Sequence, residues 1–270
     1  MYGSIVLEMG SDSPAGEILG ETTKEYVFEA CGEKLDMAQL QEIWEGKLEP
    51  VYPYRKAGPT VEKINGSLTA PAAPKIGVAK PKVIIPVFPG TNCEYDTAKA
   101  FARAGADPEI LVIRNLTPAD VAESCKALVK AIDNSQIVML PGGFSGGDEP
   151  DGSAKFIASF FRNPEVTEAV RRLLQQRDGL MLGICNGFQA LIKLGLVPYG
   201  DIRPITPYDP TLTFNTIGRH QSMLVRTRIA STGSPWLSKC EVDEQFTVAI
   251  SHGEGRFVAP QEVLDTMLRN

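Results

Sequence analysis

Short apolar runs alternate with amphipathic segments along most of the chain after residue 82. The apolar runs have the length and near-continuous hydrophobicity of buried strands; they are KVIIPVF (82–88), PEILVI (108–113), QIVML (136–140) and GLMLGI (179–184). Two of the segments between them begin with a helix-capping residue followed by proline, Thr117 with Pro118 and Asn163 with Pro164. This alternation predicts an α/β fold, in which a parallel sheet is covered by helices on both faces.

The first 50 residues follow a different pattern. GSIVLEM (3–9) and KEYVFEA (24–30) have the composition of strands, and residues 36–48 predict a helix with Asp36 and Gln39 at capping-box spacing. Two strands and one helix are too few to close a core. We therefore expect a small α+β fragment over residues 1–50, a proline-rich linker over 51–81, and the main domain over 82–270.

Composition narrows the classes of partner. The chain has 270 residues, 43% of them hydrophobic, and a formal net charge of −6, so we expect no nucleic acid or membrane partner, because both require clustered Lys and Arg. No apolar run is long enough to span a bilayer and no signal peptide is evident, which predicts a cytoplasmic protein. The five scattered cysteines and two histidines support neither a disulfide framework nor a metal site.

The most informative motif is Gly183-Ile-Cys185-Asn186-Gly187, at the end of the last apolar run. This G-x-nucleophile-x-G spacing is typical of a sharp strand-to-helix turn that exposes a nucleophile. The helix N-terminus favours the thiolate of Cys185, and the amide of Asn186 points to where an oxyanion would form. The alternative interpretation is a buried thiol in a tight turn, since cysteine is among the most buried residue types.

A second loop favours the catalytic interpretation. Gly142 and Gly143 follow the run QIVML, and a glycine pair there lets backbone amides approach a ligand closely. The alternative is a plain surface loop. The other cysteines have no activating context: Cys125 falls on an apolar helix face, and Cys93 and Cys240 fall in loops.

Five ordered blocks carry a family resemblance: PVFPGTNCEYD, LPGGFSGGDEPDGSAKF, GICNGFQALIKLGLVP, FNTIGRHQS and ISHGEGRF. They resemble the class I glutamine amidotransferase domain of the phosphoribosylformylglycinamidine synthase family, in its large single-chain form. The resemblance implies a flavodoxin-like sheet over 82–270. Residues 1–50 resemble the tail of the ATP-binding synthetase domain that precedes this glutaminase.

The resemblance also implies roles for individual residues. Cys185 would attack the carboxamide of glutamine and release ammonia for the ATP-dependent amidation of formylglycinamide ribonucleotide. The implied oxyanion donors are the amides of Gly143, Phe144 and Asn186, and the implied substrate-binding residues are Gln189, Ser251 and His252. Partners would be glutamine and the rest of the synthetase polypeptide. No cofactor is expected in this segment, whereas the intact enzyme would use ATP and Mg²⁺.

Two departures from the family pattern accompany the resemblance. The catalytic His and Glu of the family belong to an H-P-E segment beyond the last block, and it is absent from these 270 residues, so we expect a C-terminally truncated domain with negligible turnover by itself. Cys185, His252 and Glu254 could mimic a triad, but we interpret ISHGE as a substrate loop or a polar turn. His220 stands where an aromatic residue is usual, and its role stays open.

Two other functions remain as alternatives. The first is a free-standing cysteine hydrolase that uses the same turn without ammonia transfer, and it would require a complete triad within the chain. The second is a non-catalytic docking module in which the turn is vestigial.

Overall fold

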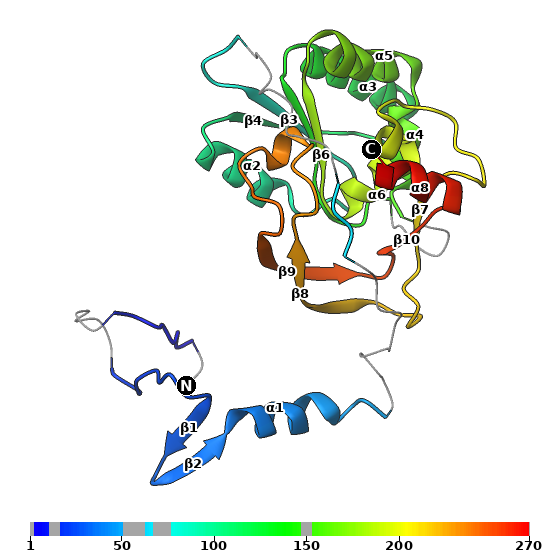
Figure 1. The fold of residues 1–270 in the computed structure, drawn as a ribbon. Helices are drawn as coiled ribbons and strands as arrows, with labels where there is room; N and C mark the ends of the chain where they lie inside the picture. The colour runs from blue at the N-terminus through cyan, green and yellow to red at the C-terminus, as the bar shows by residue number, and fades with distance from the viewer. Residues whose placement is uncertain (1–2, 11–16, 51–62, 67–76, 147–152, 270) are drawn as a thin grey trace. The chain divides into compact units, whose positions relative to one another are not determined.

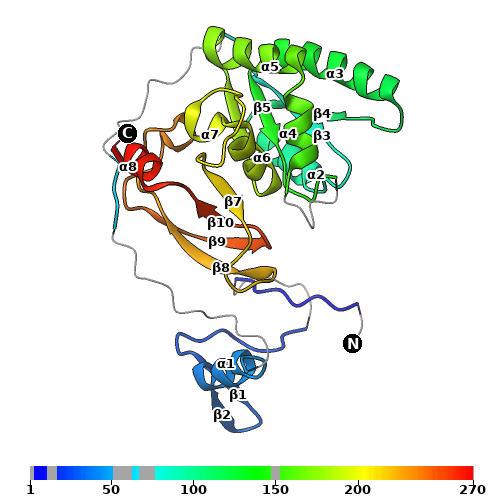
Figure 2. The ribbon, with the colours of Figure 1, turned by 90° about the vertical axis from the view of Figure 1, so that its right-hand side faces the viewer.

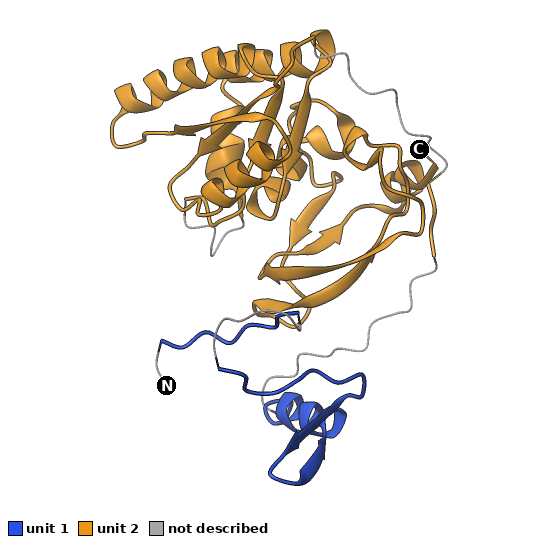
Figure 3. Cartoon of the chain, turned by 90° about the vertical axis from the view of Figure 1, so that its left-hand side faces the viewer, with its two compact units in different colours: residues 1–57 blue, residues 58–270 orange. Residues whose placement is uncertain are grey.

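The computed structural model describes residues 3–10, 17–50, 63–66, 77–146 and 153–269. It divides into two compact units, residues 1–57 and residues 58–270 (Figure 3), and each is described by itself. Most of the linker expected over 51–81 and the acidic residues 148–151 lie outside the described residues.

The first unit contains a hairpin and a helix. Strands β1 (Val27–Ala30) and β2 (Glu33–Asp36) pair antiparallel, and helix α1 (Met37–Gly46) follows directly. The Asp36 carboxylate accepts hydrogen bonds from the amides of Ala38 and Gln39, so the predicted capped helix is confirmed. The strand predicted over 3–9 is wrong, because these residues form no strand and pair with none of the strands that the structure describes. No described residue of this unit is buried.

A four-stranded parallel sheet forms the centre of the second unit (Figures 1 and 2). Its strand order is β4-β3-β5-β6, the order of the first four strands of a flavodoxin-like sheet. The strands match the four predicted apolar runs within one residue, and they are β3 (Lys82–Val87), β4 (Asp107–Val112), β5 (Ile137–Leu140) and β6 (Leu180–Gly183). The predicted fold class is therefore confirmed.

The helices between these strands include both predicted capped helices. Thr117 and Asp120 form a reciprocal capping box, and the Asn163 side chain accepts from the Glu165 amide. The helical segments are α2 (Glu94–Arg103), α3 (Pro118–Asp133), α4 (Lys155–Phe161), α5 (Pro164–Arg171), the π-helical turn η1 (Arg172–Gln176), α6 (Asn186–Leu194) and α7 (Leu196–Tyr199).

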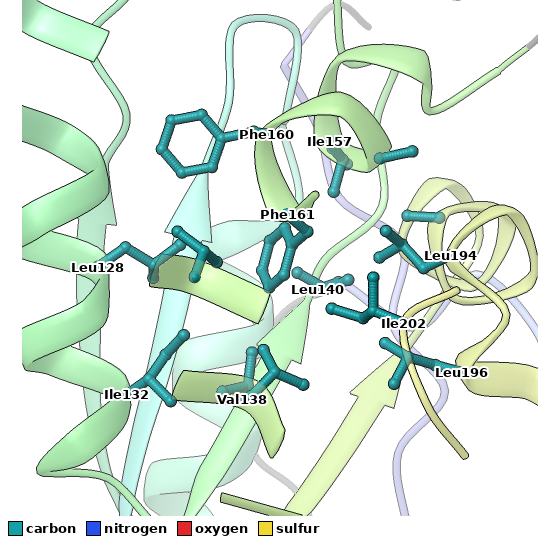
Figure 4. Close-up of a cluster of buried hydrophobic side chains, with 14 of the residues drawn as sticks. Leu128, Ile132, Val138, Leu140, Ile157, Phe160, Phe161, Leu194, Leu196 and Ile202 are labelled. Atoms are coloured by element: carbon teal, nitrogen blue, oxygen red, sulfur yellow. The ribbon is translucent and has the colours of Figure 1, made fainter. Parts of the chain in front are cut away.

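Side chains of β3 alternate between two cores, one on each face of the sheet. Val83 and Ile85 pack with Phe101 of α2, whereas Ile84 packs with residues of α3, α4, α5 and α6. Figure 4 shows the larger core, where Leu128, Val138 and Phe161 converge. Cys125 is buried in this core, as the pattern of α3 predicts.

The remaining elements are two antiparallel strand pairs and two short helical segments. The strands are β7 (Thr211–Thr213), which pairs with β10 (Arg256–Val258), and β8 (Gln221–Arg228), which pairs with β9 (Gln245–His252). The helical segments are η2 (Pro235–Leu237) and α8 (Gln261–Arg269). None of the described helices is both long and apolar enough to cross a bilayer.

The larger core makes Leu128 a sensitive position. Leu128 is fully buried on α3, so Leu128→Ala should lower the free energy of unfolding by about 2–5 kcal/mol, because it removes buried methyl groups and leaves a cavity. Leu116→Ala is the matched control, since Leu116 is 92% exposed, and it should change stability by no more than about 0.5 kcal/mol. Urea denaturation followed by circular dichroism measures both. Equal effects would contradict the assigned core.

Candidate active site

Three loops meet at the carboxyl edge of the sheet. They follow β3, β5 and β6, and β5 lies between the other two strands. The Asn92 amide donates to the Gly142 carbonyl at 3.4 Å, and the Ile184 amide donates to the Leu140 carbonyl at 3.1 Å. The loops predicted from the sequence to carry the chemistry are therefore side by side, as parallel strands require.

Cys185 occupies the turn between β6 and α6. Its φ of 53° and ψ of −111° are unusual for a residue with a side chain, and the residue is exposed. A residue in a sparsely populated φ/ψ region persists only where the surrounding structure stabilises it, and such residues cluster at functional sites. The strand-turn-helix geometry that the G-x-C-x-G spacing predicts is present.

The glycines flanking Cys185 are required by close backbone contacts. A Cβ on Gly187 would lie 1.9 Å from the Leu140 carbonyl oxygen, and one on Gly183 would lie 2.6 Å from the Gly187 carbonyl. Neither position tolerates a side chain without a shift of backbone. Helix α6 can therefore begin directly against the end of β5, and this approach sets the turn at Cys185.

Cys93 lies beside this turn. It is the N-cap residue of α2, and a Cβ on Gly142 would lie 3.3 Å from the Cys185 Cβ and 3.4 Å from the Cys93 Sγ. Burial raises the pKa of the Cys93 thiol, and the neighbouring Cys185 raises it further. The sequence alone gives Cys93 no activating context, because spacing along the chain does not show that β3 and β6 are the two neighbours of β5. The loop that contains Gly142 follows β5.

The predicted oxyanion donors differ in their availability. Gly143 has a φ of 141°, and its amide has no hydrogen-bond partner among the described residues. The Phe144 amide instead donates to the Gly90 carbonyl at 2.8 Å, within an antiparallel bridge between Thr91 and Gly143. In this conformation the Phe144 amide is not available to an oxyanion, so of the two predicted donors in this loop only the Gly143 amide has no partner among the described residues.

Asn186 and Gln189 connect the start of α6 to two other segments. The buried Asn186 side chain accepts from the Ser145 amide and donates to the Gln189 carboxamide oxygen. Gln189 Nε2 donates to the Glu254 carbonyl at 2.8 Å. The carboxamide of Gln189 is thus occupied by protein contacts, and it holds the loop after β9 against α6.

Glu254 is buried, and its side chain does not contact His252 through any hydrogen bond of the described residues. Glu254 Oε2 accepts from the Ser153 amide at 2.9 Å and from the Ser153 hydroxyl at 2.6 Å. Its Oε1 has no partner among the described residues. A triad of Cys185, His252 and Glu254 is therefore not formed among the described residues. Of the segment ISHGE, only Gly253 and Glu254 lie in a loop, because Ile250, Ser251 and His252 are the last residues of β9.

Asn215 fixes the ring of His252. Asn215 Nδ2 donates to the carbonyls of Arg219 and His252, so its Oδ1 must face the His252 Nδ1, at 2.9 Å. This assignment makes Nδ1 the protonated ring nitrogen and leaves Nε2 as an acceptor. Gly255 accommodates the ring, since a Cβ there would lie 2.2 Å from His252 Cε1. Sequence analysis missed Asn215, because only folding brings it to the loop.

Ser251 and His252 are adjacent residues of β9, so their side chains leave the strand on opposite faces. Ser251 Oγ lies 2.8 Å from His220 Nε2, and both residues are exposed. The structure thus pairs His220 with Ser251, and it does not bring the side chains of Ser251 and His252 into one pocket.

An open cavity of about 460 Å³ lies at the ends of β3 and β4. Its lining includes Phe88, Arg114 and Leu116 and none of the predicted site residues. Among the described residues, no group of three or more His, Cys, Asp or Glu side chains could hold a metal ion.

This fold and this nucleophile turn define a class. Residues 80–270 match the family of CobB/CobQ-like glutamine amidotransferase domains, and the chain belongs to that family. The predicted class of enzyme, a glutamine amidotransferase, is confirmed.

Individual relatives carry the name phosphoribosylformylglycinamidine synthase subunit PurQ. The protein of that name from Mycolicibacterium paratuberculosis is 38% identical over 187 residues, which are 69% of this chain and 69% of the relative. The one from Rubrobacter xylanophilus is 34% identical over 183 residues, 68% of this chain and 69% of the relative. A chain in the structure of PurLQS from Thermotoga maritima is 25% identical, with a TM-score of 0.50, and the match covers 67% of this chain and 70% of that chain.

The Asn215 contacts predict a measurable tautomer. In the protein as it stands, ¹⁵N chemical shifts of His252 should report the Nδ1-protonated form. Asn215→Ala should remove this preference, and it should lower the free energy of unfolding by about 1 kcal/mol, because two part-buried carbonyls lose their donor.

Asn115→Ala is the control for this experiment, since Asn115 is exposed and makes no side-chain hydrogen bond to another described residue. It should leave the His252 shifts unchanged. An Nε2-protonated His252 in the unaltered protein would contradict the assigned geometry.

Proposed function

We propose that residues 82–270 are the glutaminase portion of a phosphoribosylformylglycinamidine synthase. The observation that carries the proposal is Cys185, exposed at a positive φ between β6 and α6 and next to the loop of Gly142 and Gly143. The relatives named as PurQ subunits support the same assignment.

In the proposed reaction, the Cys185 thiolate attacks the side-chain carboxamide carbon of glutamine. The negative charge that develops on the carbonyl oxygen is stabilised by the amide of Gly143 and, as the sequence predicts, by the amide of Asn186. The carbon–nitrogen bond then breaks, and ammonia leaves with the proton originally on the thiol. Water hydrolyses the γ-glutamyl thioester to glutamate and restores Cys185.

Two further residues would position the substrate. His252 Nε2 is an acceptor that suits a donor such as the α-ammonium group of glutamine, whereas Ser251, on the opposite face of β9, pairs with His220 instead. Gln189 would act indirectly, because its carboxamide holds the Glu254 carbonyl and with it the loop that directly follows His252.

We further propose that the parent protein is the large single-chain form, in which residues 1–50 end the synthetase domain. The first unit supports this, because its described residues are all partly or fully exposed, including Trp44 at 80%, and they need another surface to cover them. The synthetase would receive the ammonia and use ATP and Mg²⁺.

A second candidate is a free-standing cysteine hydrolase with His252 as its base. One observation favours it: Asn215 orients His252 through Nδ1, as the third residue of a Cys-His-Asn arrangement does. This candidate predicts rapid reaction of Cys185 with any small electrophile, whereas a glutaminase requires recognition of glutamine.

Competitive labelling separates the two. Cys185 should react with a glutamine-like chloroketone on the order of 10² faster than with iodoacetamide, because a bound substrate analogue is held close to the sulfur. Cys185→Ser should abolish the labelling, and Cys31→Ser should not, since Cys31 is an exposed cysteine of the first unit. Equal rates with both reagents would favour the hydrolase, and no labelling at all would contradict both.

A further inference from the structure

Cys93 and Cys185 border the same small space at the carboxyl edge of the sheet. Neighbouring strands of a sheet are about 4.8 Å apart, so the loops after β3 and β6 start about 10 Å apart with β5 between them. The residue that stands between the two cysteines is Gly142, in the loop after β5. Because Gly142 has no side chain, no Cβ separates the side chains of Cys93 and Cys185 at the end of β5.

The atoms are within reach of one another. A Cβ on Gly142 would lie 3.3 Å from the Cys185 Cβ and 3.4 Å from the Cys93 Sγ, so these two atoms are at most 6.7 Å apart. In a disulfide the two Cβ atoms are about 3.8 Å apart and each Cβ lies about 3 Å from the opposite sulfur, so side-chain rotations together with loop shifts must bring the Cys93 Sγ closer to Cys185. Both residues are exposed, so a small oxidant has access to them.

We propose that Cys93 and Cys185 form a reversible disulfide that caps the nucleophile under oxidation by a hydroperoxide. The Cys185 thiolate attacks one peroxide oxygen, the oxygen–oxygen bond breaks, and Cys185 becomes a sulfenic acid while hydroxide leaves. The Cys93 sulfur then attacks the Cys185 sulfur, the sulfur–oxygen bond breaks, and water leaves with the Cys93 proton. The two thiols have lost two electrons, which the peroxide has gained.

The order of these steps follows from the environment of each sulfur. Burial and the neighbouring Cys185, Asp96 and Glu94 keep the Cys93 thiol protonated to higher pH, so it reacts slowly with peroxide itself. Cys185 stands exposed on the turn at the start of α6. Cys93 therefore acts as the resolving thiol, and it protects Cys185 from irreversible oxidation to the sulfinic acid.

The inference needs only the two thiols and not the glutaminase reaction, so its test uses mass rather than activity. The full chain is treated with hydrogen peroxide, blocked with iodoacetamide, and digested without reductant. Mass spectrometry should find the peptides of Cys93 and Cys185 joined. In a second sample that is not treated with iodoacetamide, titration under denaturing conditions should count three free thiols instead of five. Dithiothreitol should restore all five.

Cys93→Ser is the decisive variant. It should leave Cys185 unable to form the internal bond, so peroxide should convert Cys185 to a sulfinic acid that dithiothreitol does not reverse. Cys31→Ser, the matched control in the first unit, should still form the bond. The proposal is overturned if Cys185 is not oxidised, if it pairs with another cysteine or with a second chain, or if Cys93→Ser recovers as fully as the unaltered protein.

Discussion

The site depends on the close approach of the first turn of α6 to the end of β5, where a Cβ added to Gly187 would lie 1.9 Å from the Leu140 carbonyl oxygen. Any side chain at residue 187 would lift the helix from the sheet. Since Cys185 joins β6 to this helix, the contact leaves its backbone little room, and the positive φ of Cys185 follows. The core beneath supports the arrangement, because Leu140 and Ala190 are fully buried in it. The reactive geometry therefore depends on ordinary sheet-to-helix packing.

A second layer of contacts holds the loops around the nucleophile. Asn186, Gln189 and Glu254 form a chain of hydrogen bonds from the Ser145 amide to the loop after β9, and Asn215 anchors that loop from the other side. These groups are buried, so an unpaired member would be costly. Polar residues that a glutaminase could use for substrate thus serve first to position backbone.

The sequence predicted the central sheet well, because its strands are short apolar runs, and the two predicted caps of the intervening helices, Thr117 and Asn163, were confirmed. It also located Cys185, since G-x-C-x-G is a local pattern. It could not show Asn215 beside His252 or Cys93 beside Cys185, because these pairs are 37 and 92 residues apart and meet only through strand order. The expected strand at 3–9 failed because composition alone supplies no pairing partner.

The most direct test of this account is the alkylation rate of Cys185 by iodoacetamide in Gly187→Ala. The added methyl group should displace α6, and the rate should fall at least tenfold while circular dichroism shows a retained fold. Gly46→Ala is the control, because a Cβ on Gly46 would meet no atom within 4 Å, and it should leave the rate unchanged. A Gly187→Ala protein that folds and reacts at the original rate would contradict the claim that this contact sets the nucleophile.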